Sequence, residues 1–511
     1  MGRRRRIVDR PGRRGRAYSV DFRPEGMPHG IDLVVEPGTR DAEPLLDLLP
    51  HEQNLMVISM LRDGEGYRAW GKCDTVDGQS MSMVIESDDG KTWRRPSLGL
   101  VEYDGSRANN FIPSISEMFP GRAISGATVF IDPSAPPEQR YKAIGPHYFT
   151  RAEVEDYLRD RADEVDEKAL TNIALEHLGF GGDDVFGVLG QYSSDGLVFH
   201  RLPQPLVLAH TDNQITAGYD PVSGTYVAYF RDWLARTHPA YRPDTWMGEP
   251  GAYANAWFEV GHRILARTET DDFTRWPLAE PVLTDTPHLS PTESIYTTAW
   301  SPFPGAPDHP LVFPTVWDTS VDAHAVYLCS SPDGTGRTWQ WLSREPLLTA
   351  SRGREWDSGT VFSHPELCEF PDGEFGLLFS GFNVPHKHPR SQVTFANGLL
   401  RWPRGRLAGI RARTDGGFET VAFLPPGGRL RINALTSGTG GLEVEVRDFA
   451  GETVPGRSFA DCDELAGDLY DHPVTWSGVD GMGVADGEPV RLAVRLRDST
   501  LYWFAFGGHD G

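Results

Sequence analysis

The sequence predicts an all-β protein: a β-propeller followed by a small β-sandwich, with one short helical insertion. Three observations lead to this fold class. Short segments of alternating apolar and polar residues, broken by Gly and Pro turns, run from about residue 30 to residue 420. Four turns between them repeat one motif, which is typical of a propeller. Beyond residue 425 the alternating strands continue without the motif, which favours a separate sandwich.

The repeated motif is a Ser or Thr, one or two acids, often a Gly, and then an aromatic residue. Its four copies lie in Ser87–Trp93, Ser194–Phe199, Thr270–Trp276 and Ser331–Trp339. An Asp side chain in such a turn can accept N–H bonds from its own backbone, while the aromatic ring packs beneath. We therefore expect Asp89, Asp195 and Asp333 to stabilise turns and not to act as catalysts.

We expect a flexible basic arm over residues 1–29, a propeller over 30–420 and a sandwich over 421–511. One segment of the propeller region, residues 151–178, contains no Gly or Pro and has apolar residues at helical spacing, so it predicts the helical insertion. Such a helix either packs on the flank of the propeller or forms a lid or oligomer contact near its pocket.

Composition excludes several classes of partner. The formal charge of −23 argues against binding to nucleic acid or to an anionic membrane surface. There is no apolar segment of about 18 residues that would span a membrane. The four Cys residues form no CxxC pair, which indicates a reduced compartment and no structural zinc. We expect a cytoplasmic protein without a metal or other cofactor, and the oligomeric state stays open.

Longer stretches carry a resemblance to known proteins. They are Arg94–Asn110, Arg267–Pro277, Ser294–Tyr296, Phe459–Asp463 and Asp498–Phe506. Over about residues 55–511 the chain resembles bacterial propeller proteins similar to glycoside hydrolase families 32 and 43, and its repeated motif resembles the Asp-box of sialidases. The resemblance implies a five-bladed propeller in which acids on the inner strands converge on the axis.

Hydrolysis of a glycosidic bond needs two carboxyl groups, one protonated and one ionised. Three acids outside the repeated motif adjoin apolar strands of different expected blades, namely Asp212, Glu293 and Glu366. We expect Asp212 to be the nucleophile or general base and Glu293 to be the general acid. Glu366 would replace either one or tune its pKa. The alternative for each acid is a solvated loop carboxylate or a cap.

Five further residues are candidates for substrate binding, because they offer a cation, an amide, an aromatic face or an imidazole. They are Arg231, Asn109, Asn110, Trp317 and His364. The alternative functions are an ion pair between blades for Arg231, turn formation for the two Asn residues, and core packing for Trp317. The expected partner is thus a carbohydrate or glycoside substrate.

Two other functions compete with a glycoside hydrolase. One is a non-catalytic carbohydrate-binding or scaffold propeller. The other is a sialidase-like exo-glycosidase, in which Arg231, Arg263 and Arg354 would clamp a carboxylate and Tyr296 would act near Glu293. The Arg-Ile-Pro type motif of sialidases is missing, which favours the first assignment. His386 and His388 have no carboxylate at matching spacing and do not predict a metal site.

Overall fold

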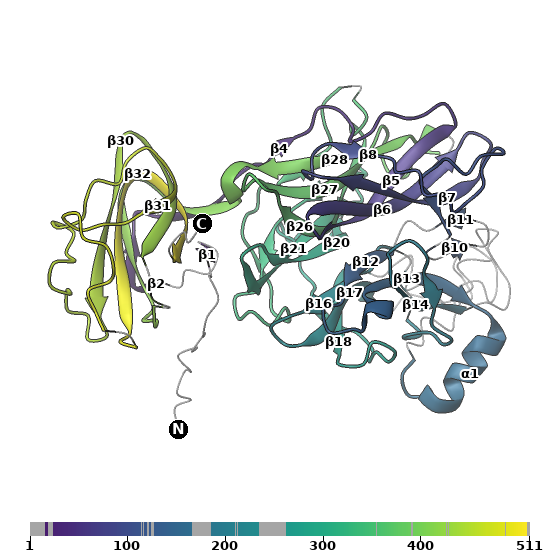
Figure 1. Ribbon diagram of the computed structural model, residues 1–511, viewed down its shortest axis with the longest axis horizontal. Helices are drawn as coiled ribbons and strands as arrows, with labels where there is room; N and C mark the ends of the chain where they lie inside the picture. The colour runs from purple at the N-terminus through teal and green to yellow at the C-terminus, as the bar shows by residue number, and fades with distance from the viewer. Residues whose placement is uncertain are drawn as a thin grey trace. The chain divides into compact units, whose positions relative to one another are not determined.

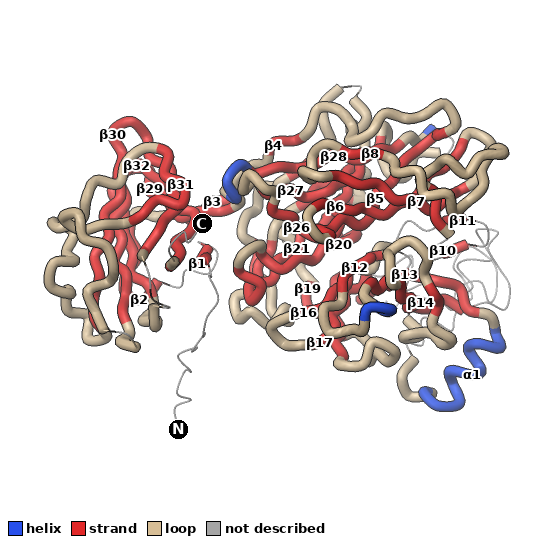
Figure 2. The backbone as a smooth tube through the Cα atoms, viewed as in Figure 1, coloured by secondary structure: helices blue, strands red, loops and turns tan. Residues whose placement is uncertain are grey.

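The computed structural model describes residues 16–18, 24–113, 115, 117–119, 122–123, 127–165, 185–209, 211, 213–234, 262–353, 355–389, 392–425, 427, 429–485 and 487–507. These residues form mainly β-strands (Figure 2). The chain divides into two compact units (Figure 1). One unit comprises residues 38–302 and 310–401; the other comprises residues 1–37, 303–309 and 402–511.

The larger unit consists of five mainly antiparallel sheets, which follow one another along the chain as the blades of a propeller. Blade 1 contains β5 (Glu52–Asp63), β6 (Gly66–Thr75), β7 (Ser80–Ser87), β8 (Trp93–Arg94), β9 (Phe111–Ile112), β10 (Glu117–Phe119) and β11 (Arg122–Ala123). Blade 2 contains β12 (Thr128–Ile131), β13 (Tyr141–Phe149), β14 (Val185–Ser193) and β15 (His200–Arg201). Blade 3 contains β16 (Thr216–Asp220), β17 (Thr225–Leu234), β18 (His262–Thr270) and β19 (Glu280–Leu283).

The last two blades complete the ring. Blade 4 contains β20 (Glu293–Phe303), β21 (Ala306–Asp318), β22 (Ala323–Val326), β23 (Cys329–Ser330), β24 (Gln340–Trp341) and β25 (Leu348–Thr349). Blade 5 contains β26 (Thr360–Glu369), β27 (Phe375–Phe382) and β28 (Phe395–Trp402), and its outer edge is β4 (Thr39–Arg40). Because β4 comes from the start of the unit and pairs with β28, the blade that closes the ring is built from both ends of this part of the chain.

Polar side chains join each blade to the next. The Ser59 hydroxyl donates to the Val129 carbonyl, and the Thr128 hydroxyl donates to the Ile215 carbonyl. The Thr216 hydroxyl accepts from the Trp300 N–H, and the Ser301 hydroxyl accepts from the Leu367 N–H. The Asn397 amide bonds both the N–H and the carbonyl of Val57. These five links run from blade 1 through blade 5 and back to blade 1. The predicted five-bladed propeller is therefore confirmed.

The repeated motif forms the turns that were expected. The carboxylate of Asp89 accepts N–H bonds from Lys91 and Thr92, and that of Asp195 accepts them from Leu197 and Val198. In three copies a Ser hydroxyl two positions earlier donates to the Asp at 2.9 Å, namely Ser87, Ser193 and Ser331. The second copy thus begins at Ser193, one residue before the serine expected from the sequence.

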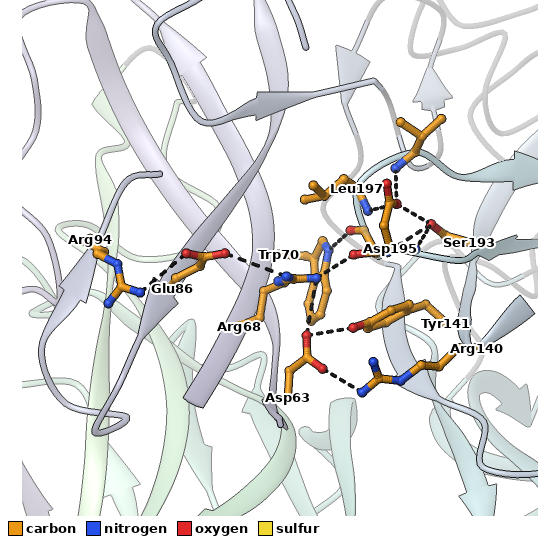
Figure 3. Close-up of polar contacts among 12 residues, drawn as sticks. Asp63, Arg68, Trp70, Glu86, Arg94, Arg140, Tyr141, Ser193, Asp195 and Leu197 are labelled. Atoms are coloured by element: carbon orange, nitrogen blue, oxygen red, sulfur yellow. Dashed lines mark hydrogen bonds and ion pairs between the residues drawn. The ribbon is translucent and has the colours of Figure 1, made fainter. Parts of the chain in front are cut away.

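These turns also fasten the blades to one another. Figure 3 shows the turn of Asp195, in blade 2, lying against β6 of blade 1. Arg68 donates to the carbonyl of Asp195 at 2.6 Å, and the indole N–H of Trp70 donates to the carbonyl of Gly196 at 2.7 Å. Asp63 then binds both Arg68 and the Tyr141 hydroxyl. A local turn motif therefore contributes directly to the packing between blades.

Replacing Asp89 by Ala should lower the free energy of unfolding without changing activity. Desolvation of the Asp89 carboxyl opposes its ionisation, but N–H bonds from Thr92 and Lys91 outweigh it and lower its pKa to about 2. This pKa shift limits the contribution of the charged Asp89 to the free energy of unfolding to about 2 kcal/mol. Because solvent screens the charge at this exposed site, we expect the substitution to lower the free energy of unfolding by about 1 kcal/mol. Because the folded pKa is depressed, this contribution is complete above the unfolded value near pH 3.8 and disappears as the pH falls towards 2. Urea unfolding at pH 7 and at pH 2.5 measures it; an equal loss at both values would contradict the electrostatic explanation.

The helical insertion contains one helix, α1 (Arg151–Arg161), on blade 2. Thr150 and Glu153 form a capping box at its start. Val154 and Tyr157 pack on a small apolar cluster that contains Phe149 of β13. The helix therefore packs on the flank of the propeller, and residues 166–178 of the predicted insertion lie outside the described ranges. Within those ranges, no helix has the length and apolar character needed to cross a membrane.

The smaller unit contains one seven-stranded antiparallel sheet (Figure 1) with a hydrophobic core of its own. Its strands are β1 (Arg16–Tyr18), β2 (Pro24–His29), β3 (Asp32–Val35), β29 (Ala408–Thr420), β30 (Leu430–Asp448), β31 (Asp468–Pro473) and β32 (Val490–Phe506). The long strands β29, β30 and β32 contain register shifts, and such irregularities let a strand bend. β1 and β2 fall within the stretch expected to be a basic arm and pair with β32 and β29.

Candidate functional site

The inner strands give the propeller axis two distinct ends. The five inner strands are β5, β12, β16, β20 and β26. The second halves of β5, β20 and β26 line one common cavity, so these strands run in the same direction along the axis. We call the end where the inner strands begin the entry end, and the end where they finish the exit end.

At the entry end, three blades converge on Tyr296 of β20. The Tyr296 hydroxyl lies 2.6 Å from Nε2 of His386, which follows β27 in blade 5. The guanidinium of Arg231, on β17 of blade 3, lies 4.1 Å from the centroid of the Tyr296 ring. The same Arg231 donates through Nε to the Tyr296 carbonyl at 2.8 Å, and Asn213 donates to that carbonyl at 2.9 Å. Tyr296 thus has contacts from both neighbouring blades.

Trp317 and His324 extend this group on blade 4. They lie opposite each other in the β21–β22 pair, and their rings stack at 5.9 Å with an interplanar angle of 9°. The His324 ring also meets the edge of the Tyr296 ring at 5.0 Å. Burial, reinforced by the charges of Arg231, Lys387 and Arg263, lowers the pKa of His324 to about 3. The imidazole is therefore neutral at physiological pH. We name Arg231, Tyr296, Trp317, His324 and His386 the Tyr296 cluster.

Several buried polar atoms in the first half of β20 and on the strands near it have no hydrogen-bond partner among the described residues. They include both ring nitrogens of His324, Oε2 of Glu293, and the hydroxyls of Thr211, Ser294, Thr297 and Thr298. An unsatisfied buried polar group typically costs about 1–3 kcal/mol, so native proteins contain few of them. A concentration of such groups at the axis of a propeller marks a candidate binding site.

The structure brings several predicted residues to this end. Glu293 is the first residue of β20, three positions before Tyr296, and is 8% exposed. Arg231 and Trp317 belong to the Tyr296 cluster. Asp212 lies outside the described residues, although its neighbour Asn213 is hydrogen-bonded to Tyr296.

Glu366 lies at the opposite end of the axis. The N–H of its neighbour Leu367 donates to Ser301 Oγ at 2.9 Å, which places Glu366 level with the end of β20. Glu293 stands eight residues before Ser301 on that strand, a separation on the order of 25 Å in extended backbone. Carboxyl pairs that act on one glycosidic bond lie at most about 9.5 Å apart. Glu293 and Glu366 therefore do not work on the same bond.

The cavity at the exit end has a volume of about 130 Å³, and Glu366 is in its wall. Small-molecule sites usually measure about 300–1,000 Å³, so this cavity is small for a sugar ring. Glu366 has φ +76°, a left-handed backbone conformation that costs an ordinary residue about 1–3 kcal/mol. Burial raises the pKa of its carboxyl to about 7.

The remaining predicted residues have local partners. Both ring nitrogens of His364 are engaged, Nδ1 with Gln214 at 2.9 Å and Nε2 with Ser380 at 2.6 Å, and burial lowers its pKa to about 3. The side-chain amides of Asn109 and Asn110 donate to backbone carbonyls of blade 1. Substrate binding by these three residues stays a prediction.

Sequence reasoning missed His324. Its one available signal was a polar residue at a buried position of the short strand Ala323–Val326. His386 was considered as half of a metal pair, whereas here it binds the Tyr296 hydroxyl. Within the described ranges, no group of three or more His, Cys, Asp or Glu residues is placed to hold a metal ion.

No protein-family model and no curated protein matches the chain. Solved structures that are similar to it include an N-acetylgalactosamine deacetylase from F. plautii in complex with blood group B trisaccharide, at 11% identity and a TM-score of 0.42, covering 72% of this chain and 94% of that one. A GH43_1 enzyme from Xanthomonas citri is 10% identical with a TM-score of 0.40, covering 71% and 90%. A sucrose-6-phosphate hydrolase from Lactobacillus gasseri is 9% identical with a TM-score of 0.38, covering 88% and 92%. These likenesses are distant, and the fold assignment rests on the strand pairing of the chain itself.

Proposed function

We propose that the protein is a glycoside hydrolase that cleaves its substrate at the entry end of the propeller axis. The observation that supports this most is the position of Glu293. It is the first residue of the inner strand of blade 4, three positions before Tyr296, and its Oε2 has no hydrogen-bond partner within the described residues. A buried carboxyl oxygen without a protein partner can serve a catalytic role.

In this proposal Glu293 is the general acid that protonates the leaving-group oxygen. Asp212 supplies the second carboxyl as nucleophile or general base, since it precedes β16, the inner strand of the adjacent blade 3. Glu366 takes no part, because it lies at the other end of the axis. The distance between the Asp212 and Glu293 carboxyls would decide the stereochemistry: about 5 Å implies retention and about 6.5–9.5 Å implies inversion.

The Tyr296 cluster is suited to hold a sugar. A neutral imidazole such as that of His324 has one donor and one acceptor nitrogen, the pair of functions that a hydroxyl group requires. Arg231 fixes the backbone of Tyr296 through its carbonyl and so orients this surface.

A second candidate is a sialidase-like exo-glycosidase. One observation favours it: the guanidinium groups of Arg231 and Arg263 lie 4.1 Å and 5.8 Å from the Tyr296 ring centroid. Sialidases use a Tyr as nucleophile and are an exception to the paired-carboxylate scheme. The two candidates differ in substrate charge, which a direct assay separates.

The purified protein should hydrolyse at least one member of a panel of neutral aryl glycosides and oligosaccharides, and Asp212→Asn should abolish that release. Asp220→Asn is the matched control, because Asp220 makes the turn after β16 and is hydrogen-bonded to Val222. Release from a fluorogenic sialoside alone would select the sialidase-like candidate. Sugar binding without product release across the panel would replace hydrolysis by carbohydrate binding.

A further inference from the structure

The proposed hydrolysis leaves Glu366 unused, although this residue lines a cavity. Five inner strands contribute to the wall of that cavity at the exit end. The pairing of β26 with β27 shifts register between Ser363 and Leu367, next to Glu366. Such a bulge re-aims a side chain, and the positive φ of Glu366 lies inside it. Local strain of this kind is often maintained at functional sites.

The Glu366 carboxyl makes no hydrogen bond or ion pair with any residue that the structure describes, and burial is the one cause that shifts its pKa upward, to about 7. Three other titratable or charged side chains belong to the cavity wall or face Glu366: Arg62 of β5, Tyr219 of β16 and Cys368 of β26. Arg62 is exposed. Burial keeps the Cys368 thiol protonated by raising its pKa well above the usual value. His364, two residues away on β26, is neutral.

Three of the residues that line the cavity with Glu366 are aromatic. Phe130 of β12, Tyr219 of β16 and Trp300 of β20 line the cavity together with Glu366. Gly218 permits the close approach of Trp300, since a Cβ at this position would lie 2.6 Å from its ring. A carboxylate next to several aromatic rings is a recognised environment for an organic ammonium ion, which is attracted both by the negative charge and by the π-faces.

We propose that the exit-end cavity binds a small organic ammonium ion, with Glu366 as its counter-ion and Phe130, Tyr219 and Trp300 as its aromatic walls. The size agrees with this occupant: a cavity of about 150 Å³ admits benzene, and the volume here is about 130 Å³. Tetramethylammonium has fewer heavy atoms than benzene, whereas a sugar ring with its hydroxyls has more. This site is separate from the entry-end site and does not depend on hydrolysis.

Calorimetric titration of the full chain tests the proposal with two probes of similar size, tetramethylammonium chloride and neutral tert-butyl alcohol. At pH 8 the ammonium ion should bind saturably and the alcohol should not. Binding should weaken about tenfold at pH 6, because a carboxyl with a pKa of about 7 is then mostly protonated and uncharged. Sodium chloride at equal ionic strength controls for general screening.

Glu366→Gln is the matched variant, because it keeps the shape of the side chain and removes its charge. It should lose ammonium binding and its pH dependence while keeping the wild-type circular dichroism spectrum. Tyr219→Leu should weaken the binding of the ammonium ion several-fold, because it removes one aromatic ring. The pH dependence of binding should stay the same, because the Glu366 carboxylate is still present. The proposal would be overturned if the protein bound the alcohol as tightly as the ammonium ion, or if Glu366→Gln bound the ammonium ion as the wild type does. Displacement of the bound ammonium ion by sodium alone would assign the site to an inorganic cation.

Discussion

Glu293→Gln should lower the turnover of any cleaved glycoside by about 10²–10⁴-fold, the usual contribution of a positioned general acid. The amide keeps the size of the side chain but has no acidic proton to deliver to the leaving group. The loss should be largest for substrates with poor leaving groups and small for activated aryl glycosides, which need little protonation. Steady-state kinetics on one substrate of each kind measure the difference.

Glu280→Gln provides the control for this substitution. Glu280 lies on the exposed strand β19 of blade 3, away from the inner strands. Its substitution makes the same chemical change, from a carboxyl to an amide, at a position with no proposed role in catalysis. Its turnover should equal that of the wild type. If Glu293→Gln were as active as this control on both substrates, Glu293 would have no role as the acid, and the proposed mechanism would fail even if hydrolysis were observed.

Asn397→Leu should lower the free energy of unfolding of the propeller by about 3–5 kcal/mol. The Asn397 side chain closes the ring, because its Oδ1 accepts from the Val57 N–H at 2.6 Å and its Nδ2 donates to the Val57 carbonyl at 2.9 Å. The same amide donates to Ser380 Oγ at 2.9 Å. Leu has a similar volume and cannot form these bonds, so the polar groups of Val57 and Ser380 stay buried without that partner.

Urea unfolding followed by Trp fluorescence measures this loss. The control is Asn383→Leu, at a loop position where Asn383 bonds the backbone of Thr394 and Gln392 near the surface. Water can replace those bonds, so the control should lose less than about 1 kcal/mol. If Asn397→Leu lowered the free energy of unfolding by a similarly small amount, the polar links between blades would contribute little to closure of the ring.

The propeller was predictable because its signals are local. The turn around Asp89 depends on residues within four positions of one another, and the alternation along β6 is visible in a short window of sequence. Helix α1 was equally local, since its capping box joins Thr150 to Glu153. The second copy of the turn motif was misplaced by one residue, because Ser193 and Ser194 are both serines and the choice between them depends on the register of β14.

The candidate site was only partly predictable. Glu293 and Arg231 could be chosen because each adjoins an apolar strand, but that rule selected Glu366 equally well. Position along the axis separates Glu366 from Glu293, and that position follows from the hydrogen bond between Leu367 and Ser301 of different blades. His324 had no signal of its own, since its importance comes from its stack on Trp317 and its contact with Tyr296.

The sequence by itself determined the all-β class, the turns that mark the blades and the set of acids that adjoin inner strands. These depend on interactions between near neighbours in the chain. Only the tertiary structure decided that Glu293 and Glu366 lie at opposite ends of the axis, which aromatic and cationic groups contact Tyr296, and that Glu366 lines a cavity. The physical reason is the closed ring. It brings together residues that lie 84 to 340 positions apart in the chain, and the level of each residue on the axis depends on bonds between blades.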